Sequence, residues 1–202
     1  GDLKHNIKVD AANKSAAFAP DGKTFVTGGD DKCATIWNTR TGEKMKKLEC
    51  TDESDLRVFC VDYDPGGRFV ATAHGDKTVR IWDVGQEKCV KELKDGHEGF
   101  VSCVSYSPDG KSLATGCWGR NNSTGRIWDV QSGKCRVELK GHGWNLKCAS
   151  WSKNNRMVIT GSEDKTARIW DAVTGTEKQV LTGHTGQVYA AKLAPAERAG
   201  QF

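Results

Sequence analysis

The sequence predicts an all-β protein made of repeated four-stranded antiparallel sheets, and two observations support this fold class. Four apolar runs end in Ile-Trp, at Trp37, Trp82, Trp128 and Trp170, and the intervals between these tryptophans are 45, 46 and 42 residues. A period of this length is typical of stacked supersecondary units. Valine, isoleucine and threonine also alternate with a period of two between turn residues, which excludes a helical array.

The last complete unit shows each predicted strand clearly. Alternation from Leu146 to Trp151 predicts a first strand, and a turn separates it from a second strand at 157–160. The turn 163–165 leads to a third strand that ends at Trp170, and a further turn leads to a fourth. The same pattern predicts four units and the start of a fifth in one region, 1–202, with approximate bounds 12–48, 57–93, 100–139, 145–181 and 187–202.

Composition limits the class of protein. The 202 residues are 37% hydrophobic and include 23 glycines, as expected for short strands joined by polar turns, and no apolar stretch is long enough to span a membrane. The 30 basic and 26 acidic residues are mixed along the chain, which makes a nucleic-acid partner unlikely. Cys60, Cys103 and Cys148 occupy one repeated position, so we expect buried, reduced thiols and an intracellular protein, cytoplasmic or nuclear.

Three motifs then carry a resemblance to a known family. Gly-His pairs at 96–97, 141–142 and 183–184, the Asp-Lys-Thr turns and the Ile-Trp-Asp endings make residues 11–193 similar to the WD-repeat β-propellers. The resemblance implies four-stranded blades around a central channel, and a general role as an interaction platform. Because the family usually forms seven blades, four blades plus one strand predict a partial ring or a fragment of a larger propeller. A second chain or a missing segment would complete the ring.

The resemblance also implies a hydrogen-bond network in each blade. A buried tryptophan needs a partner for its indole N–H, and the family links it to a Ser or Thr, the His of Gly-His and an Asp in the tight turn. In the last unit these residues are Trp170, His142 and Asp164, with Thr160 or Ser162 as the hydroxyl. The other expected members are His97, His184, Asp31, Asp76, Trp37, Trp82 and Trp128.

The earlier units depart from the full network. The second lacks a Gly-His pair, the third lacks the turn Asp, and the first offers only the distant His5 as its histidine. The repeated placement of the Gly-His histidines favours a structural role over that of a zinc ligand or general base. No metal-binding, phosphate-loop or nucleophile-elbow spacing occurs in the sequence, so we expect no metal, no cofactor and no catalysis.

Residues that break the repeat predict a partner-binding rim. Trp118 and Trp144 lie outside the repeated aromatic positions, and Trp118 stands beside an insertion that lengthens the loop at 119–125. An aromatic residue and an arginine on a protruding loop are typical of interface hot spots. We therefore expect Trp118, Arg120, Trp144 and Asn145 to contact a partner. The alternative is that both rings fold back onto neighbouring loops.

The leading interpretation is a noncatalytic scaffold subunit that holds other proteins together in a multi-subunit assembly. One alternative is a substrate receptor of a ubiquitin ligase, because Trp37-Asn38-Thr39-Arg40 is similar to the Trp-Asp-x-Arg of such receptors. Another is an RNA- or ribosome-associated propeller, which requires a contiguous basic face.

Overall fold

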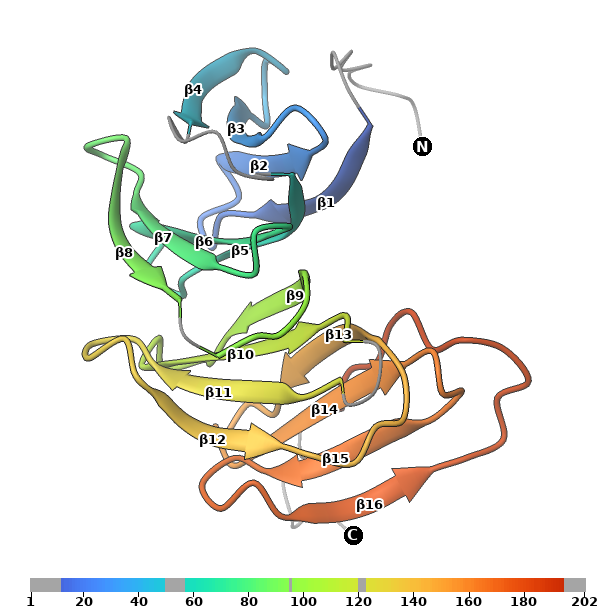
Figure 1. Cartoon of the computed structure of the whole chain (residues 1–202). Helices are drawn as coiled ribbons and strands as arrows, with labels where there is room; N and C mark the ends of the chain where they lie inside the picture. Colours follow the sequence, from blue (N-terminus) through green and yellow to red (C-terminus); the bar gives the residue numbers. More distant parts are fainter. Residues whose placement is uncertain (1–11, 50–56, 95, 120–122, 195–202) are drawn as a thin grey trace, which may run out of the picture.

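Four antiparallel sheets make up the computed structural model, which describes residues 12–49, 57–94, 96–119 and 123–194 (Figure 1). We call the sheets blades 1 to 4. Blade 1 contains β1 (Asn13–Phe18), β2 (Thr24–Gly29), β3 (Cys33–Asn38) and β4 (Lys44–Glu49), and blade 2 contains β5 (Val58–Tyr63), β6 (Phe69–His74), β7 (Val79–Asp83) and β8 (Lys88–Leu93). Blade 3 contains β9 (Val101–Tyr106), β10 (Ser112–Cys117), β11 (Gly125–Asp129) and β12 (Cys135–Leu139), and blade 4 contains β13 (Leu146–Trp151), β14 (Met157–Ser162), β15 (Ala167–Asp171) and β16 (Glu177–Leu181).

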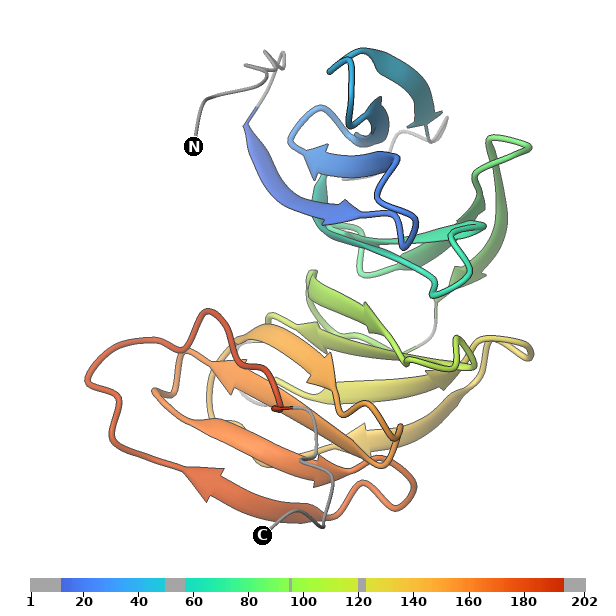
Figure 2. The same cartoon turned by 180° about the vertical axis from the view of Figure 1, so that it is seen from behind.

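Within each blade the strands pair in chain order, as tight turns between antiparallel strands require. The blades follow one another in sequence order, which Figures 1 and 2 show from both sides. The first strands β1, β5, β9 and β13 lie next to one another, so they form the inner side of the array and the fourth strands form its outer side. The prediction of an all-β partial propeller is confirmed.

The hydrophobic core lies between blades. Successive residues of a strand point to opposite faces, so Val70 of β6 packs against blade 1 while its neighbour Ala71 packs against blade 3. Both side chains are 0% exposed. Each blade therefore needs a neighbour on both faces.

Aromatic residues at the ends of the first strands show that each blade is covered by the preceding one. Tyr63, Tyr106 and Trp151 are 5%, 7% and 8% exposed because each packs against the preceding blade. Phe18 ends β1 in the same register, opposite Phe25, and it is 67% exposed. No described residue forms a blade in front of blade 1.

Basic side chains also join neighbouring blades. Nζ of Lys46 on β4 donates to the Val84 carbonyl of blade 2 at 2.7 Å. Nζ of Lys91 on β8 donates to the Val130 carbonyl of blade 3, also at 2.7 Å. Each lysine therefore reaches from an outer strand to the turn between the third and fourth strands of the next blade.

The segment after β16 differs from the prediction. Residues 187–193 were expected to form the first strand of a fifth blade, but the structure assigns no strand there. The Val188 N–H donates to the Ser162 carbonyl at 2.9 Å, and its side chain packs against Ile159 and Ala167. The segment thus covers blade 4 where a first strand would lie, yet no second strand among the described residues pairs with it.

The seven described cysteines are all free, and Cys50 lies outside the described residues. Of the three at the repeated position, Cys103 is buried, whereas Cys60 and Cys148 are half-buried. Across the described ranges, the chain has no helix long and apolar enough to cross a membrane.

Candidate functional site

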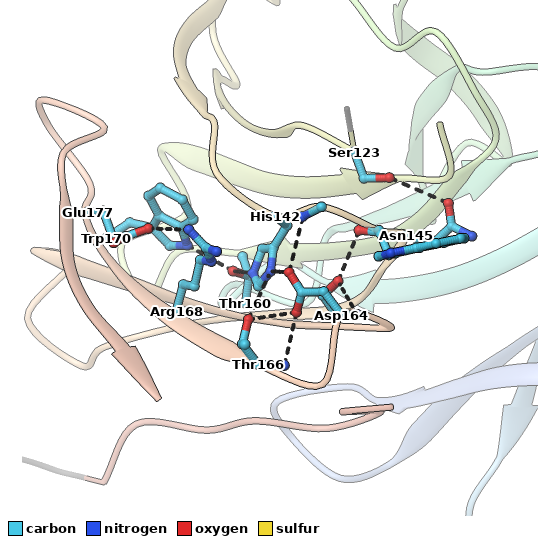
Figure 3. Close-up of polar contacts among 12 residues, drawn as sticks. Ser123, His142, Asn145, Thr160, Asp164, Thr166, Arg168, Trp170 and Glu177 are labelled. Carbon is cyan, nitrogen blue, oxygen red and sulfur yellow. Dashed lines mark hydrogen bonds and ion pairs between the residues drawn. The ribbon is translucent and has the colours of Figure 1, made fainter. Parts of the chain in front are cut away.

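Blade 4 contains a continuous chain of hydrogen bonds (Figure 3). The Trp170 indole N–H donates to Oγ1 of Thr160 at 2.8 Å, and that hydroxyl lies 2.8 Å from Nε2 of His142. Nδ1 of the same imidazole lies 2.7 Å from Oδ2 of Asp164. Of the two hydroxyls that the sequence left open, Thr160 is the one in the chain, whereas Ser162 donates to the Trp144 carbonyl at 2.9 Å.

The electrostatics assign the proton positions in this chain. Burial lowers the pKa of His142, although Asp164 partly opposes the shift, so the imidazole is neutral at neutral pH. Burial alone would raise the pKa of Asp164, but hydrogen bonds from Thr166 and His142 outweigh it and lower the pKa to about 2. Nδ1 must therefore carry the proton that faces the carboxylate, and Nε2 accepts from Thr160. Every donor then points in one direction, from indole to carboxylate.

Blade 2 uses a histidine that the sequence reasoning missed. Nε2 of His74 lies 2.6 Å from Oγ1 of Thr72, which accepts the Trp82 indole N–H at 2.8 Å. His74 belongs to β6 itself, two residues after Thr72, and so points to the same side of the strand. That spacing of two was the available signal. Asp76 instead accepts from Nη2 of Arg80 at 2.7 Å.

In blade 3 the histidine Nδ1 accepts a hydrogen bond, whereas in blade 4 it donates one. Nε2 of His97 lies 2.7 Å from Oγ1 of Thr115, which also accepts the Trp128 indole N–H at 2.8 Å. Its Nδ1, however, faces Nη1 of Arg126 at 3.2 Å. A guanidinium can only donate, so Nδ1 accepts and the proton is on Nε2. Burial and the nearby guanidinium lower the pKa of His97 to about 3.

Blade 1 and the third Gly-His pair complete the comparison. The Trp37 indole N–H donates to Thr27 at 2.9 Å, and the Cys33 thiol donates to Asp31 at 3.0 Å. His184 was expected to belong to a network, but the described residues do not bring it into one. Its side chain is exposed and makes no hydrogen bond with a described residue, because no described strand supplies the threonine and tryptophan of a fifth blade.

The second group of predicted residues lies on what we call the loop face. This face consists of the loops that enter the first strands and the turns between second and third strands. Phe100, Trp118, Trp144 and Asn145 all line one groove there, with a volume of about 700 Å³. The structure thus brings together three of the four predicted rim residues. Arg120 lies outside the described residues.

Trp118 is half-buried and packs as part of an aromatic cluster. Its ring centroid lies 6.0 Å from Phe59 and 6.5 Å from Phe100, and Nζ of Lys147 lies 4.2 Å above it. Its backbone N–H donates to the Phe100 carbonyl at 2.8 Å. The ring therefore folds back onto neighbouring elements, which was the alternative expectation.

Trp144 behaves differently, because its side chain is 63% exposed while its backbone is held. The N–H of the preceding Gly143 donates to Oδ2 of Asp164 at 3.1 Å, and the Trp144 carbonyl accepts from Ser162. Asn145 is also held, since its Nδ2 donates to Oε2 of Glu163 at 2.7 Å. The network of blade 4 thus positions an exposed indole.

No group of three or more His, Cys, Asp or Glu side chains in the described ranges is arranged to hold a metal ion.

Comparison with known proteins identifies the family to which the repeats belong. The sequence profile described as "WD domain, G-beta repeat" (WD40) matches residues 7–38, 42–83, 87–129 and 133–171. The second, third and fourth matches of this profile each begin just before the fourth strand of one blade and end at the third strand of the next blade. One sequence repeat therefore joins two blades, which accounts for the dependence of each blade on its neighbours.

Individual relatives resemble about half of the chain. It is 36% identical over 107 residues to nuclear distribution protein nudF 2 of Aspergillus clavatus, which covers 52% of this chain and 22% of the relative. It is 30% identical over 114 residues to the guanine nucleotide-binding protein subunit beta of Oryza sativa subsp. indica, covering 53% and 30%. The chain thus matches less than a third of the length of either relative. Together with the four profile matches, the four blades place this chain in the WD40 repeat family.

Proposed function

We propose that the chain is a noncatalytic scaffold that holds a partner protein on its loop face within a larger assembly. The observation that carries this proposal is Trp144, an exposed indole on a fixed backbone. Covering its exposed part would remove on the order of 100–150 Å² from water, which corresponds to roughly 3 kcal/mol. A contribution of this size is typical of an interface hot spot.

The shifted pKa values within the blade networks have structural causes. Strongly shifted imidazoles and carboxylates can mark a catalytic site. Burial lowers the pKa of His97 and of His142, and the Arg126 guanidinium adds to the shift of His97. Hydrogen bonds from Thr166 and His142 outweigh burial and lower the pKa of Asp164. The relatives support an assembly, since one of them is by name a subunit of a guanine nucleotide-binding protein.

A capture experiment with a matched control tests the proposal. Val173 is 72% exposed on the turn between β15 and β16, so Val173→Ala removes exposed apolar surface away from the loop face. Immobilised wild-type, Trp144→Ala and Val173→Ala proteins would be compared by quantitative mass spectrometry of the proteins they retain. We expect a partner that wild type and Val173→Ala retain and Trp144→Ala loses, with at least about tenfold weaker affinity for the purified partner. Identical retention by all three proteins would refute the proposal, provided that their thermal unfolding is the same.

A further inference from the structure

The groove that Trp144 borders has a lining drawn from three successive blades. Its volume is about 700 Å³, and its lining includes Lys77 of blade 2, Phe100 and Trp118 of blade 3 and Trp144 of blade 4. All of these residues belong to loops and turns of the loop face. An extended segment of a partner can therefore contact several blades at once along this groove.

Aromatic rings supply the large apolar side chains of the groove. Phe100 and Trp118 are half-buried and pack on each other, with ring centroids 6.5 Å apart. Trp144 is 63% exposed above its fixed backbone. Rings held in this way offer a large contact area and lose little conformational entropy when a partner covers them.

The charges of the groove cancel. Lys77 and Glu98 both line it with exposed side chains, and neither makes an ion pair with a described residue. One ammonium group and one carboxylate thus lie in the same groove. Its electrostatic field therefore selects neither an acidic nor a basic segment, and the chemistry of the partner must follow from other groups.

Two hydrogen-bond donors of the groove are available to a partner. The ammonium group of Lys77 and the indole N–H of Trp144 make no hydrogen bond with a described residue, and both side chains are exposed. Each can donate to a carbonyl oxygen but cannot accept. The groove thus offers donors beside its aromatic rings.

The side-chain acceptors of the groove are mostly engaged. Oδ1 of Asn145 lies 3.4 Å from the Ser123 hydroxyl, and the Asn145 carbonyl accepts from the Glu163 N–H at 2.9 Å. Among the described side chains of the lining, the carboxylate of Glu98 is the acceptor that remains free. A segment with many backbone N–H groups would leave most of them without an acceptor here, which is unfavourable.

From the aromatic lining and this donor excess we infer that the loop face binds a proline-rich segment of a partner protein. Proline lacks a backbone N–H and keeps its carbonyl, so such a segment brings acceptors and few donors. Its polyproline II conformation is extended before binding, and aromatic-lined grooves are typical sites for it.

In the bound state, proline rings pack on Trp144 and the neighbouring aromatic rings, and proline carbonyls accept from the Trp144 indole and from Lys77. The inference rests on the proposed function and names the chemistry of its partner.

Selection from a random peptide library tests the inference without a known partner. Short peptides displayed on phage would be selected in parallel on wild-type, Val173→Ala and Trp144→Ala proteins and then sequenced. We expect prolines to be enriched in the peptides that wild type and Val173→Ala select and Trp144→Ala does not. Selection of acidic, basic or aliphatic sequences without proline, or of no peptide at all, would overturn the inference.

Synthetic forms of a selected peptide measure the role of proline itself. Replacing its prolines with alanines restores the backbone N–H groups and should weaken binding to the wild-type chain at least about tenfold in fluorescence anisotropy. The affinity of an uncharged proline peptide should change little as salt rises. Equal binding of the proline and alanine peptides would contradict the inference.

Two lysines at equivalent turns supply a matched pair of variants. Lys77 and Lys32 both lie between a second and a third strand with positive φ, of 71° and 64°, but Lys32 does not line the groove. Lys77→Met removes a donor and should weaken the proline peptide about tenfold, whereas Lys32→Met should have little effect. An equal loss in both variants would contradict a specific site.

The two proposals fail separately. If Trp144→Ala loses its captured partner but the selection enriches no proline, only the chemistry of the ligand is wrong. If proline peptides bind at the groove but Trp144→Ala retains every captured partner of the wild type, the proposed function fails on its own test.

Discussion

Arg126 donates a hydrogen bond to Nδ1 of His97 at 3.2 Å, at the position where Asp164 accepts from His142 in the next blade. Equivalent histidines in adjacent blades therefore carry their proton on opposite nitrogens. Both arrangements leave the Trp–Thr hydrogen bond intact, at 2.8 Å in each blade. A blade can thus lose its turn carboxylate and still satisfy its buried indole.

His97 should make stability fall on acidification. Its pKa is about 3 in the folded protein and about 6.5 in an unfolded chain, so between these values only the unfolded chain takes up the proton. Above about pH 6.5 the imidazole is neutral in both states, and protonation does not destabilise the fold. As the pH falls from about 6.5 to about 3, the free energy of unfolding decreases by about 1.4 kcal/mol per pH unit. NMR titration should show a neutral His97 imidazole, protonated on Nε2, down to about pH 4, and a raised pKa in Arg126→Gln. Titration of His97 near pH 6.5 in the folded wild type would contradict this account.

The Thr160 hydroxyl should contribute more to the free energy of unfolding than the Thr160 methyl group does. Thr160→Val keeps the shape but leaves the Trp170 N–H and His142 Nε2 without their shared partner in a buried site, which should cost about 2–4 kcal/mol. Thr160→Ser keeps the hydroxyl and should cost about 1 kcal/mol. Urea unfolding measures both variants. Equal stability of Thr160→Val and wild type would mean that the hydrogen-bond chain does not stabilise blade 4.

Asp62 should destabilise the fold at neutral pH. Burial raises the pKa of this β5 carboxyl to about 6, although the Tyr106 N–H donates to it at 2.7 Å and Lys192 favours its charge. Because the folded pKa lies above the unfolded one, the contribution of Asp62 to stability is most favourable below about pH 4 and falls as the pH rises to about 6, by up to roughly 3 kcal/mol.

Asp62→Asn keeps an acceptor for the Tyr106 N–H and removes the charge. The variant should unfold at a higher temperature than wild type at about pH 7.5, and the difference should shrink at about pH 4.5. Calorimetry at both values measures it. A difference that grew on acidification would have the wrong sign.

Lys91 should stabilise the contact between blades 2 and 3. Its ammonium donates to the carbonyls of Val130 and Gln131, so Lys91→Met should cost about 1.5–3 kcal/mol while keeping most of the aliphatic packing. Lys88→Met, on the same strand with an exposed side chain, is the control and should change stability by less than about 0.5 kcal/mol. Chemical denaturation of the two variants compares them, and equal effects would argue against a role in joining blades.

Local pattern was enough to predict the strands and the Trp–Thr pairs. Thr160 and Trp170 face each other because Val158 pairs with Trp170 and Thr160 with Arg168 in the antiparallel register, which the alternation and the turn length together determine. The same pattern could not choose between Thr160 and Ser162, since both lie on one face of β14. The choice depends on where the preceding loop carries His142 and Trp144, which is a contact between elements.

Histidine placement was less predictable. The motif Gly-His predicted the positions of His97 and His142 but overlooked His74, which reaches the same threonine from within the strand. It also included His184, which is exposed. The Gly-His motif identifies a histidine only in the loop before the first strand. The threonine of the second strand can also be contacted by a histidine from another nearby segment, as His74 shows.

The sequence by itself determined the repeat period, the order of strands within each blade and the apolar residues of both faces, because these follow from side-chain alternation and turn chemistry along one segment. Only the tertiary structure decided which tryptophan is covered and which remains exposed. Trp118 is half-buried because Phe59, Phe100 and Lys147 from three different blades pack around it. Trp144 makes no ring contact of this kind with a described residue and is 63% exposed. Exposure is set by neighbours far away in the sequence, and those are determined by how the blades pack.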